Sequence, residues 1–199
     1  MRPLLILALL LFFAGSSLYS KTLRWCEGVI VLNNSEVLAG DVVIEPSLDL
    51  VLFRSGEVRT FYPVSKINFV SLREEGVKYP RKFISLQCEE HGKTAFRLYE
   101  VILDGDLSVI RRPNGGSLPG TDEVYGYDYF IMDKATIISL SEFRKKIYPV
   151  IENYYSEKKL TRFLSKEQLN PWSLSDAIKI INIYNDRLPI DTANISARK

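Results

Sequence analysis

Three alternating tyrosines offer the clearest binding chemistry in this chain. Tyr125, Tyr127 and Tyr129 are separated from one another by single residues. Residues two apart in a strand project from the same face, so we expect the three rings to form a row. A row of exposed rings among acidic neighbours could stack on sugar rings or on a peptide. The alternative is one face of a half-buried strand that packs on a helical tail, since strands favour tyrosine there.

Catalytic chemistry has few candidates, because the chain contains a single histidine, His91. A Ser-His-Asp or Cys-His site would have to use it. It follows Cys88 at a C-x-x-H spacing that could begin a metal site, but no second Cys/His pair completes four ligands. No phosphate-binding loop, nucleophile elbow, zinc-protease or dinucleotide-binding motif occurs. We therefore predict no catalytic residue, no metal and no cofactor.

A hydrolase that uses only carboxylates is the enzymatic alternative, because Asp and Glu are plentiful. Such enzymes work with a pair of carboxyl groups that flank the bond to be cut. No spacing in the sequence singles out a pair, so this alternative names no residues.

Cys26 and Cys88 are the only two cysteines. An oxidising compartment would allow them to pair. The bridge would close a loop of about 62 residues and stabilise the fold by about 4 kcal/mol in the chain-entropy model. The alternative is two separate buried thiols, since the sequence gives no distance between their Cα atoms.

The first twenty residues indicate export. A short basic start precedes an unbroken apolar run of eleven residues, 4–14, and a small polar finish ends at Ser20. This is the layout of a secretory signal peptide. A bilayer span needs about 20 apolar residues, so we expect no transmembrane span after cleavage. We predict that residues 1–20 are removed and that the chain works in the periplasm or at the outer membrane or cell surface.

The composition limits the partners. The chain has 26 basic and 24 acidic residues, with a formal net charge of +2. A nucleic-acid binder would carry a basic excess on one face, so we predict no nucleic-acid partner. Hydrophobic residues make up 46% of the sequence, which is typical of a globular domain with a packed core.

Short β-branched and aromatic runs with turn residues every eight to ten positions fill the chain up to residue 140. They predict an antiparallel β-rich body, a small barrel or sandwich of about 9–10 short strands. The runs are 28–32, 37–44, 48–54, 57–62, 66–72, 82–88, 94–103, 107–112, 127–132 and 136–140. Residues 113–126, rich in glycine and proline, are interpreted as a long loop beside the tyrosines.

Helical periodicity begins at Ser141, which we take as the N-cap, and continues through Phe143, Ile147 and Ile151. The fold class is therefore α+β, with a helical segment of two to three helices after the β-rich body. We divide the chain into a β-rich domain 21–140, a helical tail 141–185 packed on the sheet, and a flexible C-terminus 186–199. Two β units, 24–72 and 81–140, are an alternative division of the first part.

Two resemblances support this architecture. Residues 31–53, with Leu32-Asn33, Leu38 and Gly40, resemble the strands of Sm-like small barrels, which implies a strongly bent sheet. Residues 99–112, 127–147 and 177–185 resemble an uncharacterised family of secreted Gram-negative bacterial proteins. That family has a β-rich body and a helical tail ending in a Tyr-Asn phrase, here Tyr184-Asn185. The second resemblance implies an envelope location and carries no catalytic residues.

These observations favour a non-enzymatic envelope protein, a binding or structural module that contacts protein or glycan. The candidate contact residues are Tyr125, Tyr127 and Tyr129. The alternative function is the carboxylate-dependent hydrolase, acting on envelope polymers.

Overall fold

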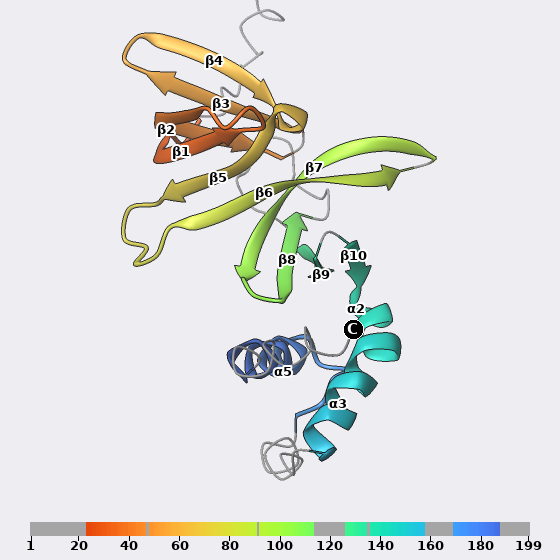
Figure 1. Cartoon of the computed structure of the whole chain (residues 1–199). Helices are drawn as coiled ribbons and strands as arrows, with labels where there is room; N and C mark the ends of the chain where they lie inside the picture. The colour runs from red at the N-terminus through yellow and green to blue at the C-terminus, as the bar shows by residue number, and fades with distance from the viewer. Residues whose placement is uncertain are drawn as a thin grey trace, which may run out of the picture.

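A computed structural model describes residues 23–46, 48–90, 92–113, 126–134, 136–157 and 169–187. The expected signal peptide, His91, Tyr125 and most of the expected flexible C-terminus lie outside these residues. Figure 1 shows a curved sheet with two helical segments gathered at one end of it.

Ten strands form one antiparallel sheet in the order β10-β9-β8-β7-β6-β5-β1-β2-β3-β4. Most neighbours in the sheet are also neighbours in the chain, because tight turns such as Ser55-Gly56 reverse the direction after each short run. The strands are β1 (Cys26–Leu32), β2 (Val37–Glu45), β3 (Leu50–Ser55), β4 (Val58–Pro63), β5 (Ile67–Arg73), β6 (Arg81–Glu90), β7 (Lys93–Leu103), β8 (Leu107–Pro113), β9 (Tyr127–Asp133) and β10 (Thr136–Ser139).

The α+β class and the strand-rich antiparallel body are confirmed, but the predicted barrel or sandwich is wrong. The strands form a single open sheet whose two edges, among the described residues, are β4 and β10. The physical reason is that β5 pairs with both β1 and β6. Because β6 occupies the second edge of β5, that edge does not pair with β4. The unit β1–β5 therefore stays open, and the sheet continues into β6–β10.

The helical tail begins at a reciprocal cap. The Ser139 hydroxyl accepts a hydrogen bond from the Glu142 amide at 3.1 Å, and the Glu142 carboxylate accepts one from the Ser139 amide at 3.1 Å. The N-cap is therefore Ser139, not Ser141 as the apolar period suggests. The helical segments are α2 (Leu140–Glu142), the π-helical turn η2 (Phe143–Ile147), α3 (Tyr148–Glu157) and α5 (Leu174–Arg187), and a 3₁₀ turn, η1 (Val64–Lys66), precedes β5.

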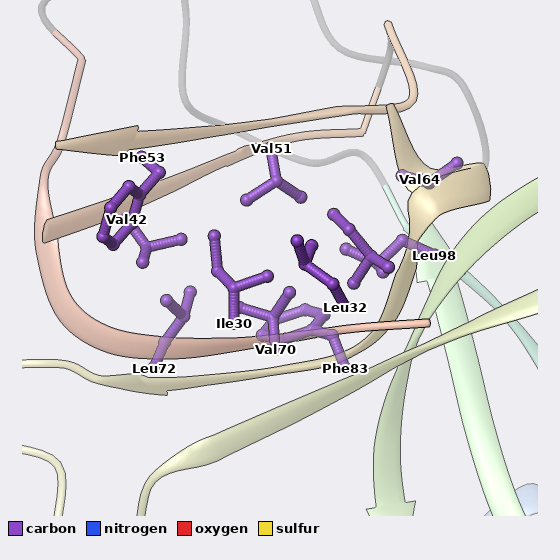
Figure 2. Packing of buried hydrophobic residues seen from close by; sticks show 11 residues of the cluster. Ile30, Leu32, Val42, Val51, Phe53, Val64, Val70, Leu72, Phe83 and Leu98 are labelled. Atoms are coloured by element: carbon purple, nitrogen blue, oxygen red, sulfur yellow. The ribbon is translucent and has the colours of Figure 1, made fainter. Parts of the chain in front are cut away.

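The buried side chains form two clusters. The first fills the space inside the curved part of the sheet made by β1–β7. Figure 2 shows Val51 of β3 pointing toward Ile30 and Val70 from the facing part of the sheet. The second cluster lies where the helices pack on β8 and β9. Its centre is Phe143, which is fully buried.

An asparagine of α5 fixes the helical tail to the sheet. The Asn185 side chain accepts a hydrogen bond from the Leu107 amide at 3.1 Å and donates one to the Leu107 carbonyl oxygen at 2.8 Å. The same side chain fills the position that a Cβ on Gly105 would take, so the β7–β8 turn is shaped around it. The Tyr-Asn phrase noted in the sequence thus includes a residue that docks the last helix.

Replacing Asn185 with alanine is expected to lower the free energy of unfolding by about 1–3 kcal/mol, because both Leu107 backbone groups lose their partner. Urea unfolding measures the change. Asn182→Ala is the matched control, since Asn182 is exposed and, among the described residues, its side chain donates a hydrogen bond to Asp186 on the same helix. Equal effects of the two substitutions would contradict a docking role for Asn185.

Candidate functional site

A pocket of about 260 Å³ opens beside the first buried cluster, whose Val42, Leu72, Phe83 and Leu98 are among its lining residues. It is set by the strand register, which places Glu100 of β7 opposite Phe83 on one side and opposite Arg111 on the other. Phe83 belongs to the first cluster, while the residue opposite Arg111 on β9, Tyr129, packs against the second. Directly opposite residues share a sheet face. Glu100 and Arg111 therefore lie on the same sheet face as Phe83 and Tyr129, between the residue of the first cluster and the residue that packs on the second.

Six charged side chains line the pocket: Arg24, Glu45, Glu74, Arg81, Glu100 and Arg111. Four of them pair with one another in alternating sign, and we call Glu74, Arg81, Glu100 and Arg111 the charged row. Glu100 is its centre, and only 8% of its side chain is exposed. One carboxylate oxygen accepts a hydrogen bond from Nε of Arg81 at 2.7 Å, and the other accepts one from Nε of Arg111 at 2.7 Å. Arg81 also donates to the Glu74 carboxylate through Nη1.

These contacts keep all the central groups charged. Burial by itself would raise the pKa of Glu100, but the hydrogen bonds and positive charges of Arg81 and Arg111 outweigh it and hold the pKa below its ordinary value. Burial would likewise lower the pKa of Arg81, but the contacts with Glu100 and Glu74 raise it. Glu100 is thus a fixed carboxylate between two fixed guanidinium groups.

Each guanidinium of the row also lies over an aromatic ring. The central carbon of Arg81 is 5.0 Å from the ring centroid of Phe83. That of Arg111 is 4.0 Å from the centroid of Tyr127. Both distances are within the range of cation–π attraction. The stacked rings hold Arg81 and Arg111 in place, so the polar groups of the pocket are preorganised.

The predicted tyrosines divide between two roles. Tyr127 lines the pocket and stacks on Arg111. Tyr129 packs against the second cluster, and its hydroxyl accepts a hydrogen bond from Nη1 of Arg111 at 3.4 Å. The packing interpretation thus describes Tyr129, while Tyr127 retains the surface that a ligand could reach. Tyr125 lies outside the described residues.

A second ion cluster lies at the β2–β3 turn. Asp49, in the β2–β3 turn, accepts a hydrogen bond from Arg97 of β7 at 2.5 Å and lies 3.8 Å from the guanidinium of Arg112 of β8. Glu45 and Pro46, just before this turn, line the pocket. The ion pairs therefore tie the end of β2 to the strands that carry the charged row.

No disulfide joins Cys26 and Cys88 in this structure. Gly28 lies opposite Leu72, and Leu72 lies opposite Arg81, so β1 and β6 run parallel with β5 between them. Gly28 and Arg81 therefore lie side by side across β5. Cys26 is two residues before Gly28, and Cys88 is seven residues after Arg81. At about 3.3 Å per residue the separation is roughly 30 Å, whereas bonded cysteines have Cα atoms within about 7 Å. Both cysteines are half-buried, and Cys26 lines the pocket.

Sequence reasoning missed the charged row. Its members come from three strands and the β5–β6 connection, and only the pairing of those strands brings them together. The local signal was Glu100, a lone acid inside the apolar stretch 98–103. A buried acid requires a partner, and this requirement could have directed attention to the arginines of neighbouring strands.

No family model, curated protein or solved structure matches this chain. Both resemblances noted in the sequence therefore stay predictions. Within the described residues, no group of three or more His, Cys, Asp or Glu is placed to hold a metal ion. No helix in that part of the chain is long and apolar enough to cross a membrane.

Proposed function

We propose that this chain is an exported, non-enzymatic binding module of the cell envelope, which contacts protein or glycan through the pocket beside Tyr127. The observation that carries the proposal is the pocket itself. Apolar side chains, the two aromatic rings of Phe83 and Tyr127 and a few fixed polar groups converge in it, which is the usual composition of a ligand site. The signal-peptide pattern supports the location in the periplasm or at the cell surface.

The charged row favours binding over carboxylate catalysis. A general acid must hold a proton near neutral pH, which requires a raised pKa. Glu100 has a lowered pKa, and both of its oxygens accept hydrogen bonds from arginines. Glu74 also pairs with Arg81. Neither Glu100 nor Glu74 therefore supports the alternative of a hydrolase acting on envelope polymers.

Truncating Tyr127 to alanine is expected to weaken ligand capture at least about tenfold, which corresponds to about 1.4 kcal/mol and is typical of a tyrosine at the centre of a contact. The measurement is surface plasmon resonance of the purified chain against a glycan fraction and a protein fraction of the envelope of its own cell. Tyr79→Ala is the matched control, because Tyr79 is 68% exposed and is not among the residues lining the pocket. Capture that survives Tyr127→Ala in a folded protein would contradict the assignment of the site.

A further inference from the structure

We propose that the pocket takes one neutral saccharide ring, such as the terminal residue of an envelope glycan. The inference rests on the proposed function, since it names the ligand class of the same pocket. Four observations lead to it: the balance of charge, the excess of hydrogen-bond donors, the apolar wall and the size of the cavity.

The formal charge of the pocket lining is balanced, because three arginines (Arg24, Arg81 and Arg111) and three glutamates (Glu45, Glu74 and Glu100) line it. Within the charged row the charges are also paired. Two carboxylates and two guanidinium groups pair with one another, and Glu100 uses both oxygens in doing so. An anionic ligand would have to compete with Glu100 for the arginines, and a cationic ligand would have to compete with the arginines for Glu100. A neutral ligand leaves all the ion pairs in place, so the row selects against charged ligands.

The hydrogen-bonding groups left over are mainly donors. A guanidinium carries five N–H groups. Within the part of the chain that the structure describes, Arg81 uses two of them, toward Glu100 and Glu74. Arg111 uses two, toward Glu100 and Tyr129. The remaining N–H groups call for a ligand rich in uncharged oxygen acceptors, and the hydroxyl, ring and acyl oxygens of a sugar meet that requirement.

Most of the other lining residues are apolar, the exceptions being Arg24 and Glu45. Leu72, Phe83 and Leu98 line the pocket together with Tyr127. A pyranose presents polar hydroxyls around its edge and C–H groups on its faces. It can therefore direct oxygens to the charged row while a C–H face lies on the apolar wall. Flexible polar chains lack that second surface, and purely apolar ligands would leave the arginine donors unpaired.

The cavity sets the size of the ligand. Its volume of about 260 Å³ lies just under the range of roughly 300–1,000 Å³ that is usual for small-molecule sites. One ring and its substituents fit such a space, and a longer glycan would continue into solvent. The pocket is therefore suited to a chain end or a single exposed residue of a glycan.

The test is a glycan array probed with the folded chain lacking residues 1–20. The array has three arms: neutral hexose and N-acetylhexosamine glycans, sulfated or uronic-acid glycans, and unglycosylated peptides. We expect binding to the neutral arm, reduced about tenfold by Tyr127→Ala and by Arg111→Lys, which keeps the charge but loses the planar donors. Tyr79→Ala and Arg54→Lys are the controls, because Arg54 pairs with Asp41 and is not a lining residue. Circular dichroism establishes that each variant is folded.

Each other outcome overturns a distinct part of the account. Binding confined to the acidic arm would overturn the requirement for a neutral ligand. Absence of glycan binding, combined with Tyr127-dependent binding to an envelope protein, would overturn the saccharide and leave the proposed function standing. Binding to neutral glycans that is insensitive to both Tyr127→Ala and Arg111→Lys would overturn the pocket as the site. No Tyr127-dependent binding to any glycan or envelope protein would overturn both proposals.

Discussion

Replacing Glu100 with leucine is expected to lower the free energy of unfolding by about 3–5 kcal/mol. Leucine has nearly the volume of glutamate but leaves the Arg81 and Arg111 guanidinium groups without the carboxylate that both contact at 2.7 Å. Partly buried charges that lose their partner are costly, because the surrounding protein replaces little of the lost hydration. Urea unfolding followed by circular dichroism measures the change.

The control for this prediction removes the charges together. The triple variant Glu100→Leu, Arg81→Met and Arg111→Met removes the three charges that meet at Glu100 and leaves of the row only Glu74, whose side chain is 27% exposed. Apolar replacement of a buried ion network is often neutral or stabilising. The triple variant should therefore recover most of the stability lost by Glu100→Leu. A triple variant less stable than the single one would show that the row acts through packing and not through its charges.

The same carboxylate gives the chain a specific response to acid. The pKa of Glu100 is lower in the folded chain than its ordinary value of 4.5. A carboxyl group of this kind stabilises the fold above its unfolded pKa, and the contribution is lost as the pH falls toward the folded pKa. We expect the wild-type free energy of unfolding to fall more steeply below about pH 4.5 than that of Glu100→Gln. Parallel pH profiles for the two proteins would contradict this.

Truncating Phe143 to alanine is expected to cost about 3–5 kcal/mol, the usual range for a fully buried phenylalanine. Its side chain is 0% exposed at the centre of the cluster that joins the helices to β8 and β9. The loss should therefore fall on the helical tail. Thermal unfolding gives the magnitude, and limited proteolysis should cut first within residues 140–187.

Trp172→Ala is the control for Phe143. Trp172 is also a large aromatic residue near the helices, but it is 65% exposed and contacts the Arg144 guanidinium instead of the core. Its loss should change stability by less than about 1 kcal/mol. A Phe143→Ala protein as stable as the Trp172→Ala protein would contradict the packing of the tail on the sheet.

Much of the fold could be predicted from local sequence. Turn signals such as Asn33-Asn34 and Asp104-Gly105 separate strands whose alternation is readable without tertiary information. Whether the sheet closes into a barrel could not be predicted in this way, because the answer depends on which strands pair with the two edges of β5. The helix start was misplaced by two residues, although Ser139 with Glu142 three residues later carries the capping-box pattern.

The candidate site likewise has one part that the local sequence predicts and one part that only strand pairing reveals. Tyr127 could be found from its spacing, since a strand face shows itself in alternate residues. The charged row could not, because Arg81, Glu100 and Arg111 are brought together by the pairing of β6, β7 and β8. The packing role of Tyr129 could not be predicted either, because the position of the helices decides which tyrosine of the strand they cover.

The most direct test of the pocket is an NMR titration of the chain labelled with ¹⁵N-arginine, using the neutral glycan that binds most strongly on the array. The Nε–H groups of Arg81 and Arg111 donate to Glu100 within the pocket, while that of Arg54, which does not line the pocket, donates to Asp41 at 3.0 Å. We expect the Arg81 and Arg111 Nε–H resonances to move and saturate together, with Arg54 unchanged. Saturable binding that leaves both pocket arginines unmoved would place the ligand elsewhere and contradict the central claim.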